Sequence, residues 1–220
     1  MSFFQPYIYA IILSFLVSLV VYFKPSPYYL RFFPPFLFIT AGVESYAAYL
    51  QSVGKHNITI YNFFTVFEFA FYLLVIALIT GDKQWKKIIF ISIPVYVIIA
   101  CGNIFFVIEK NSLHSITYCL GCLLIVIFCI HYFLELFRLP KWSKLSNNPA
   151  VWICSGLLFF YCCGFPFFGL MNYWGQTPGG YVFLVKYYLP ISNILNVALY
   201  TLFAIAFLCN RTRKYTLSSS

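Results

Sequence analysis

One apolar stretch, Asn57–Thr80, restricts the possible folds of this chain more than any other feature. Its length is about that needed for one helix to cross the hydrocarbon core of a bilayer. Near its middle the stretch carries one acid, Glu68. A carboxylate in the middle of a bilayer costs about 3 kcal/mol or more unless other groups solvate it. We therefore expect Glu68 to face other helices or a wet cavity. A narrow polar stripe at helical spacing runs along the stretch: Tyr61, Thr65, Glu68 and Tyr72.

Six further apolar segments predict an all-α membrane protein. Hydrophobic residues make up 62% of the chain and charged residues 9%, a balance that a soluble domain of 220 residues could not bury. We expect a single bundle of seven transmembrane helices over residues 1–210 and a short basic, polar cytoplasmic tail over 211–220. The predicted segments are Gln5–Phe23, Tyr28–Leu50, Asn57–Thr80, Ile88–Ile108, Leu113–Phe137, Ala150–Met171 and Phe183–Cys209.

Helix-breaking residues occur inside two of these segments. Pro34 and Pro35 predict a kink early in the second segment, because proline removes a backbone donor and crowds the preceding turn. In the sixth segment, Gly164, Pro166 and Gly169 predict an interruption. Irregular backbone at membrane depth is tolerated where it is buried in protein or lines a cavity. The first segment lacks the basic region and cleavage site of a signal peptide, so we expect it to be a spanning helix.

Lysine and arginine are distributed unequally between alternate loops. Eleven fall on the side that holds the C-terminus, and three fall on the other side, namely Lys55, Lys110 and Lys186. Because cytoplasmic loops carry the excess of positive charge, we expect the N-terminus outside and the C-terminus inside the membrane. The same asymmetry accounts for the net charge of +9 without a nucleic-acid partner.

With this orientation, polar residues gather in the outer half of several helices, and we infer an outward-facing polar pocket. Asn193 and Asn196 are the expected hydrogen-bond donors to Glu68. Glu44 is expected to cap a tyrosine or asparagine network, or to pair with Lys186. The candidate ligand-binding or coupling residues are Glu68, Glu44, Asn62, Tyr61, Asn103, Asn193 and Asn196.

Other pairs of reactive residues favour structural roles. His131 and Glu135 are four residues apart, and we expect a local salt bridge rather than a proton relay. Cys119 and Cys122 have a spacing found in metal and redox sites, but without a second pair, packing of small residues between helices explains them better. The eight cysteines are expected to be reduced. The sequence predicts no metal, no cofactor and no catalytic residue.

Three short stretches carry a resemblance: Tyr61–Phe69, Trp152–Tyr161, and Ile194–Asn196 followed by Tyr200. They resemble a group of small seven-helix membrane proteins common in Bacteroidota. In that group, some similar regions precede signalling domains. The resemblance implies a bacterial host, in which we expect a multi-pass protein of the inner membrane, and it implies no particular mechanism.

Three classes of function remain open. The first is a sensory or accessory module in the lipid bilayer that holds a small ligand, or a membrane partner's helix, in the outer pocket. The second is a small transporter or ion-coupled carrier that uses Glu68 as its coupling acid. The third is a lipid-modifying enzyme with Glu44, Glu68 and His114 around a metal, and it lacks any visible nucleophile–base spacing. We rank them in this order and expect a protein that is not an enzyme.

Overall fold

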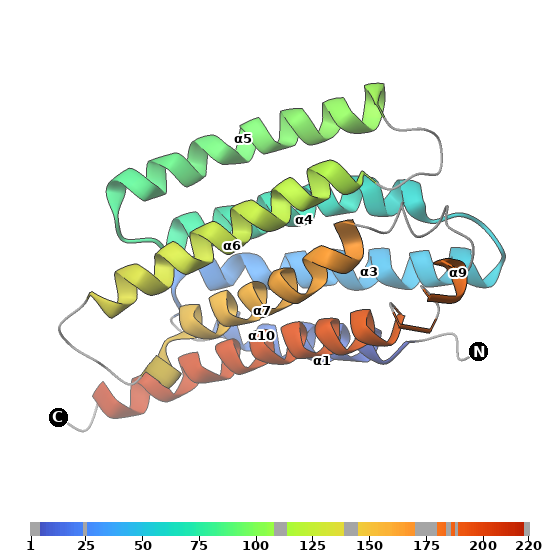
Figure 1. Ribbon diagram of the computed structural model, residues 1–220. Helices are drawn as coiled ribbons and strands as arrows, with labels where there is room; N and C mark the ends of the chain where they lie inside the picture. The colour runs from blue at the N-terminus through green and yellow to red at the C-terminus, as the bar shows by residue number, and fades with distance from the viewer. Residues whose placement is uncertain are drawn as a thin grey trace.

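The computed structural model describes residues 5–23, 26–107, 114–138, 145–169, 180–183, 186–187 and 189–217. Within these ranges the chain is helical and contains no strand, and the long helices lie side by side (Figure 1). Six spans are long and apolar enough to cross a membrane, which confirms a helical, multi-pass type of protein. These spans are Pro6–Phe23, Ile58–Ile79, Lys83–Phe106, Ser115–Phe137, Pro149–Pro166 and Leu189–Cys209.

The helices follow the predicted segments closely in the first half of the chain. Four lysines that contribute to the predicted orientation lie outside the described residues: Lys24, Lys110, Lys141 and Lys144. The elements are α1 Pro6–Ser18, α2 Val20–Phe23, the 3₁₀ helix η1 Tyr28–Phe32, α3 Phe33–Ser52, α4 Ile58–Ile79, α5 Lys83–Phe106, α6 Ser115–Phe137, the 3₁₀ helix η2 Leu145–Asn147, α7 Pro149–Gly169, α9 Gly180–Phe183 and α10 Leu189–Leu217.

Helix α3 corresponds to the second predicted segment, but it is not among the six most apolar spans. Two prolines, Glu44 and several tyrosines reduce its apolar character. The predicted kink is wrong, because Pro34 and Pro35 stand in the first turn of α3. There a missing N–H removes no intrahelical hydrogen bond, so the prolines start the helix.

The predicted interruption of the sixth segment is also wrong over the described residues. Helix α7 continues through Gly164 and Pro166 to Gly169, and Met171 lies outside the described residues. The last long helix begins at Leu189 rather than at the predicted Phe183, which ends α9. At its other end, α10 continues to Leu217, through residues expected to form a polar tail.

Helix α4 is the centre of the assembly. Eleven of the 22 residues of α4 are buried, against three of the 24 residues of α5. Helix α5 packs mainly on α4 and α6. Phe69 of α4 is fully enclosed by the rings of Tyr96, Tyr118 and Tyr161. A Cβ atom on Gly121 of α6 would lie 2.8 Å from the Phe69 ring, so glycine permits the close approach of α4 and α6.

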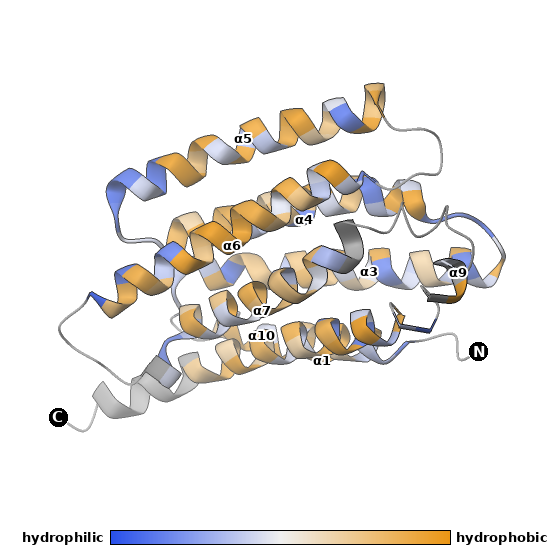
Figure 2. Cartoon of the chain, viewed as in Figure 1, coloured by the Kyte–Doolittle hydropathy of each residue, from blue (hydrophilic) through white to orange (hydrophobic). Residues whose placement is uncertain are grey.

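The remaining helices form a connected series beside α4. Helix α6 packs on α7, α7 on α10, α10 on α1, and α1 on α3. Helices α3 and α4 are consecutive in sequence, yet they meet over a small area. Where they do meet, Phe36 and Phe71 stack with ring centroids 3.8 Å apart. Hydrophobic residues cover the helices along most of their length, and hydrophilic ones gather at the connections (Figure 2).

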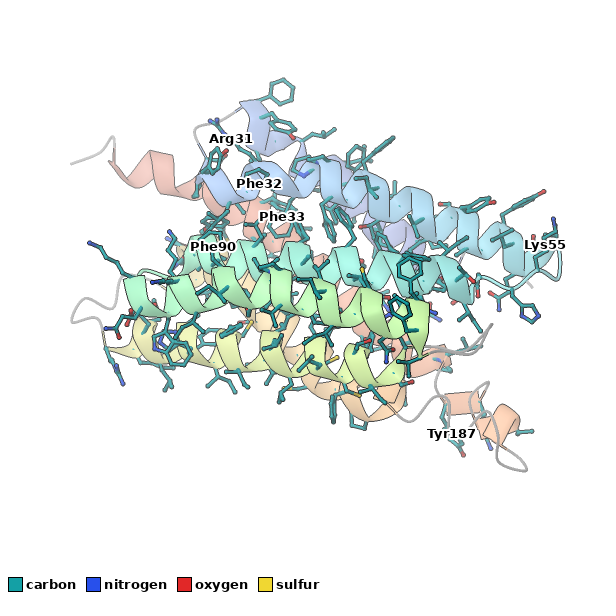
Figure 3. The ribbon with its side chains drawn as sticks, turned by 90° about the horizontal axis from the view of Figure 1, so that it is seen from above. Arg31, Phe32, Phe33, Lys55, Phe90 and Tyr187 are labelled. Carbon is teal, nitrogen blue, oxygen red and sulfur yellow. The ribbon has the colours of Figure 1, made fainter. Side chains whose placement is uncertain are left out.

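We name the two ends of the assembly after α4: the Asn57 end, where α4 begins, and the Gly81 end, where it finishes. Helix α3 runs in the opposite direction. Arg31 therefore lies at the Gly81 end, and Lys55 lies at the Asn57 end (Figure 3).

Candidate functional site

Glu44 joins three helices through its carboxylate. Its Oε2 accepts hydrogen bonds from the hydroxyl of Tyr7 on α1, at 2.8 Å, and from the hydroxyl of Tyr61 on α4, at 2.9 Å. These two hydroxyls come from segments far apart in sequence, so the acid holds α1, α3 and α4 together. The alternative pairing of Glu44 with Lys186 is wrong, because the Lys186 amine lies over the ring of Tyr187, 5.3 Å from its centroid.

Glu68 occupies the middle of the predicted polar stripe. The hydroxyl of Tyr72, one turn further along α4, donates to its Oε1 at 3.1 Å. Tyr72 also interacts through its hydroxyl with Tyr200 of α10, and both rings are buried. One turn before the acid, the buried Thr65 hydroxyl donates to the Tyr61 carbonyl. The stripe therefore faces other helices, as expected.

Each acid keeps one carboxylate oxygen without a hydrogen-bond partner among the described residues. These are Oε1 of Glu44 and Oε2 of Glu68, and neither is among the fully buried unpaired atoms. Both side chains are half-buried, and the two interact electrostatically. In the described part of the chain, no lysine, arginine or histidine compensates either acid. The pair is thus half-buried and lacks a cationic partner in the described ranges.

Two buried tyrosine hydroxyls near Glu68 have no hydrogen-bond partner within the described ranges. They belong to Tyr96 of α5 and Tyr161 of α7, whose side chains are almost fully enclosed. Both interact electrostatically with Glu68. A buried hydroxyl without a partner is unfavourable by about 1–3 kcal/mol. These two hydroxyls make the surroundings of Glu68 polar within an otherwise apolar core.

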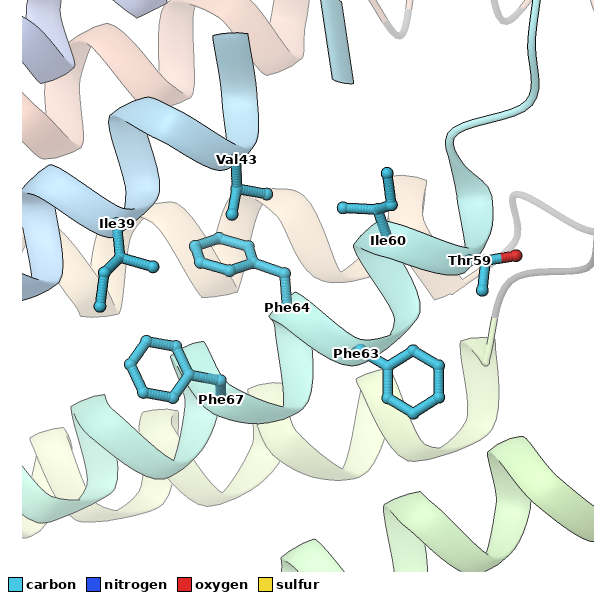
Figure 4. A pocket seen from close by; sticks show the side chains of 7 residues that line it. All are labelled: Ile39, Val43, Thr59, Ile60, Phe63, Phe64 and Phe67. Atoms are coloured by element: carbon cyan, nitrogen blue, oxygen red, sulfur yellow. The ribbon is translucent and has the colours of Figure 1, made fainter. Parts of the chain in front are cut away.

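A groove lies between α3 and α4 (Figure 4). Its volume is about 490 Å³, within the usual range for ligand pockets. The lining is apolar apart from one threonine, whereas the sequence predicts a polar pocket. The lining residues are Ile39, Val43, Thr59, Ile60, Phe63, Phe64 and Phe67.

Asn62 and His114 form a separate polar contact at the Asn57 end. Asn62 Oδ1 accepts the backbone N–H of His114 at 3.3 Å, and the His114 Nδ1 lies 2.8 Å from the hydroxyl of Thr117. His114 precedes the span of α6 and is 1% exposed. Burial lowers the pKa of His114 to about 4, so this imidazole is neutral at pH 7. Asn62 therefore secures the start of α6.

The other predicted asparagines do not join the acid pair. Asn193 donates to Gln5 Oε1 and to the Leu189 carbonyl, both at 2.9 Å, so the prediction that it donates to Glu68 is wrong.

The same correction applies to Asn196, which donates to the carbonyl and hydroxyl of Ser192 on its own helix. Asn103 is half-buried on α5, and in the described part of the chain its side chain makes no hydrogen bond. An asparagine amide on a helix can donate to the backbone carbonyl one turn earlier, so it needs no partner on another helix. For this reason the spacing of Asn196 did not predict its partner.

At the Gly81 end, His131 and Glu135 do not form the predicted salt bridge. The His131 ring stacks on Trp85, with centroids 4.0 Å apart and planes 23° from parallel. Both oxygens of Glu135 accept the backbone N–H of Gly81, at 3.1 and 3.4 Å. The two side chains thus fasten the α4–α5 connection to α6, and we call this arrangement the Gly81 latch.

The remaining chemistry is sparse. None of the eight cysteines, all within the described ranges, forms a disulfide. Among the described residues, no group of three or more histidine, cysteine or acidic side chains is arranged to hold a metal ion. The observed cluster therefore consists of two carboxylates in a frame of tyrosine hydroxyls.

Sequence reasoning missed Tyr7, Tyr96 and Tyr161. These residues lie on α1, α5 and α7, and their spacing within each helix carries no signal. With 19 tyrosines in the chain, residue type alone does not single them out. Only the packing of different helices against one another brings them near the acids.

Comparison with known protein families, with curated proteins and with solved structures gives no match. The resemblance to small seven-helix proteins of Bacteroidota remains an expectation. What the chain does must therefore be argued from its own residues.

Proposed function

We propose that this protein is a membrane-embedded binding module, sensory or accessory in role, that holds a small cationic ligand at Glu44 and Glu68. The observation that carries this proposal is that each acid has one oxygen engaged by tyrosine and one oxygen without a hydrogen-bond partner in the described ranges. A structural acid in a membrane normally has its charge compensated by neighbouring groups. Here two acids lie within electrostatic reach of each other without a cation in the described ranges.

The chemistry of the surroundings favours a cation over an anion or a neutral molecule. Two carboxylates repel an anion, and they gain most from a group that carries positive charge and N–H donors. The rings of Tyr7, Tyr61 and Tyr72 add surfaces that attract cations. A primary ammonium group meets these requirements.

Binding can be tested with methylammonium chloride as the probe and sodium chloride at equal ionic strength as the reference. A ligand that binds only the folded state stabilises it by about 2.7 kcal/mol at a hundred times its Kd, and the melting temperature rises as a result. We expect a rise for the wild type and a much smaller one for Glu44→Gln and Glu68→Gln. Glu135→Gln is the matched control. An equal response of all four proteins would refute the proposal.

A second candidate, an ion-coupled carrier, draws support from one observation: Tyr200 and Tyr72 link α10 to Glu68. Such a chain of hydroxyls can pass a proton to a carboxylate. Proton flux into liposomes, followed with an internal pH dye, tests it. Flux that disappears in Glu68→Gln and persists in Glu135→Gln favours the carrier, whereas ligand binding without flux favours the module.

The membrane arrangement is part of the proposal. We propose that α3 spans the membrane in addition to the six apolar spans, which gives seven spans. The protein would lie in a bacterial inner membrane with the Asn57 end outside. The 20 residues of α3 measure about 30 Å, the thickness of the hydrocarbon core. Tyrosine partners of Glu44 reduce the cost of placing this helix in lipid. A phosphatase fused to the C-terminus should be inactive. Activity of this fusion in the periplasm would contradict the proposed orientation.

A further inference from the structure

We infer that an internal hydration site lies beside Glu68, in which water binds the buried hydroxyls of Tyr96 on α5 and Tyr161 on α7. Neither tyrosine belongs to the residues assigned to the proposed cation, so this site is independent of that ligand. Three features support it: the burial of the two hydroxyls, the groups that they share as neighbours, and the chemistry that can satisfy them.

Both hydroxyls are enclosed in the core. Tyr96 and Tyr161 are each 1% exposed, and their hydroxyl oxygens have no hydrogen-bond partner among the described residues. Each tyrosine stands near the middle of its helix, Lys83–Phe106 for the first and Pro149–Gly169 for the second. The hydrocarbon core of a bilayer holds no bulk water, so at that depth only protein groups or internal water can bind a hydroxyl.

The two tyrosines meet around the ring of Phe69 on α4. The Phe69 ring centroid lies 5.6 Å from that of Tyr96 and 5.1 Å from that of Tyr161. Both tyrosines interact electrostatically with the same two groups, the Glu68 carboxylate and the Cys122 thiol. Two different helices therefore place their unpaired hydroxyls in one region, rather than in separate parts of the core.

Other tyrosines of the same region do have protein partners. The Tyr118 hydroxyl interacts with the Cys122 thiol through a hydrogen bond. The Tyr72 hydroxyl donates to Glu68 Oε1 at 3.1 Å. The protein thus satisfies some hydroxyls around Glu68 by itself, and within the described ranges it leaves two without a partner.

The chemistry of these groups selects water as the occupant. A tyrosine hydroxyl has one proton to donate and lone pairs that accept. An ammonium group cannot accept the protons of the two hydroxyls, and an anion is repelled by Glu68. Water both donates and accepts, and a buried water typically makes about three hydrogen bonds to polar groups. The two hydroxyls and Glu68 Oε2, which has no hydrogen bond in the described part of the chain, supply that number of partners.

Internal water also lowers the cost of placing Glu68 in the middle of α4. A carboxylate at membrane depth is unfavourable unless other groups solvate it. In the part of the chain that the structure describes, Glu68 accepts one hydrogen bond, from Tyr72. Water held by Tyr96 and Tyr161 gives the acid a second source of hydrogen bonds.

Hydroxyl-radical footprinting with synchrotron X-rays tests the site, because bound water releases radicals that oxidise the side chains beside it. Full-length protein in phosphatidylcholine nanodiscs is irradiated, and oxidised residues are located by mass spectrometry. Phe69 and Phe33 are a matched pair, since both are fully buried, but Phe33 packs against phenylalanine rings. We expect the oxidation of Phe69 to exceed that of Phe33 several-fold. Equal oxidation of the two would refute the hydration site.

Tyr96→Phe and Tyr161→Phe each remove one hydroxyl and keep the ring. If water binds these hydroxyls, both variants melt at a lower temperature than the wild type, and in the double variant the oxidation of Phe69 falls to the level of Phe33. A dry, unpaired hydroxyl gives the opposite result, a rise in melting temperature, and that rise would overturn the site. Tyr46→Phe, at a position that is 55% exposed, is the control and should melt as the wild type does.

Methylammonium separates a failure of this site from a failure of the proposed function. If Phe69 is oxidised no more than Phe33 while methylammonium still stabilises the protein, the hydration site is refuted and the binding module stands. Oxidation of Phe69 that depends on the two hydroxyls, without a methylammonium response, supports the hydration site and refutes the module. Variants that melt lower although Phe69 is not oxidised would show that protein groups bind the hydroxyls, which also overturns the site.

Discussion

Glutamate is used in two different ways in this molecule. At the Gly81 latch, both oxygens of Glu135 accept the same backbone N–H, and the neighbouring His131 stacks on Trp85. In the acid pair, Glu44 and Glu68 each have one oxygen bound by tyrosine and the other without a hydrogen bond in the described part of the chain. An acid whose two oxygens are both engaged serves to hold the backbone, whereas an acid with a spare acceptor oxygen can bind a ligand.

The largest effect on stability should follow loss of the Glu44 carboxylate. Glu44→Leu removes the acceptor that the hydroxyls of Tyr7 and Tyr61 share, a loss of about 1–3 kcal/mol. We expect the melting temperature in detergent to fall by several degrees. Glu44→Gln, which keeps an acceptor oxygen, should fall far less. If both variants melt alike, the tyrosine bonds do not hold the three helices together.

A pH effect should come from His114, a buried imidazole at the Asn57 end that lies outside the apolar spans. Its pKa of about 4 lies below the unfolded value of about 6.5, so the unfolded state binds more protons in between. Its contribution is fully present above pH 6.5 and is lost as the pH falls toward 4. Between pH 7 and pH 5 the loss is about 2 kcal/mol. Melting curves of wild type and His114→Asn should converge over this range, whereas His56→Asn should follow the wild type.

A double-mutant cycle measures how strongly Glu68 depends on its tyrosine. Glu68→Leu strips the buried Tyr72 hydroxyl of its acceptor, whereas Glu68→Leu with Tyr72→Phe removes both partners together. The coupling free energy from the four melting curves should be about 1 kcal/mol. A coupling near zero would mean that Tyr200 alone satisfies Tyr72.

The smallest effect is expected at the Gly81 latch. Glu135→Gln retains an acceptor for the Gly81 N–H, so stability should change by less than about 0.5 kcal/mol, and Glu135→Ala should cost about 1 kcal/mol. Neither variant should alter the methylammonium response. A large loss of ligand binding in Glu135→Gln would end the distinction between the two kinds of acid.

Much of the fold was predictable from the sequence because each apolar segment is long enough to span a bilayer. Asn57–Thr80 became α4 almost residue for residue, and its stripe faces other helices as expected. The predictions made from the prolines failed, because the effect of a proline depends on whether it stands in the first turn of a helix or inside it. Pro34 starts α3, and Pro166 lies within an unbroken α7.

The candidate site was predictable only in part. Glu68, Glu44 and Tyr61 were identified because acids and their neighbours at membrane depth need partners. Their actual partners depend on which helices meet, and spacing within one helix does not contain this information. Asn196 illustrates the limit, since its amide bonds to Ser192 one turn earlier and never reaches Glu68.

Helix α10 has a mechanical consequence for any signal that starts at Glu68. It is 29 residues, or about 44 Å, long, and its apolar span ends at Cys209. Tyr200, which contacts Tyr72, lies about 26 Å from the far end of the same rigid rod. A tilt of about 10° at Tyr200 would swing Leu217 by about 4–5 Å. A small rearrangement around Glu68 is thereby enlarged into a displacement beyond the apolar span.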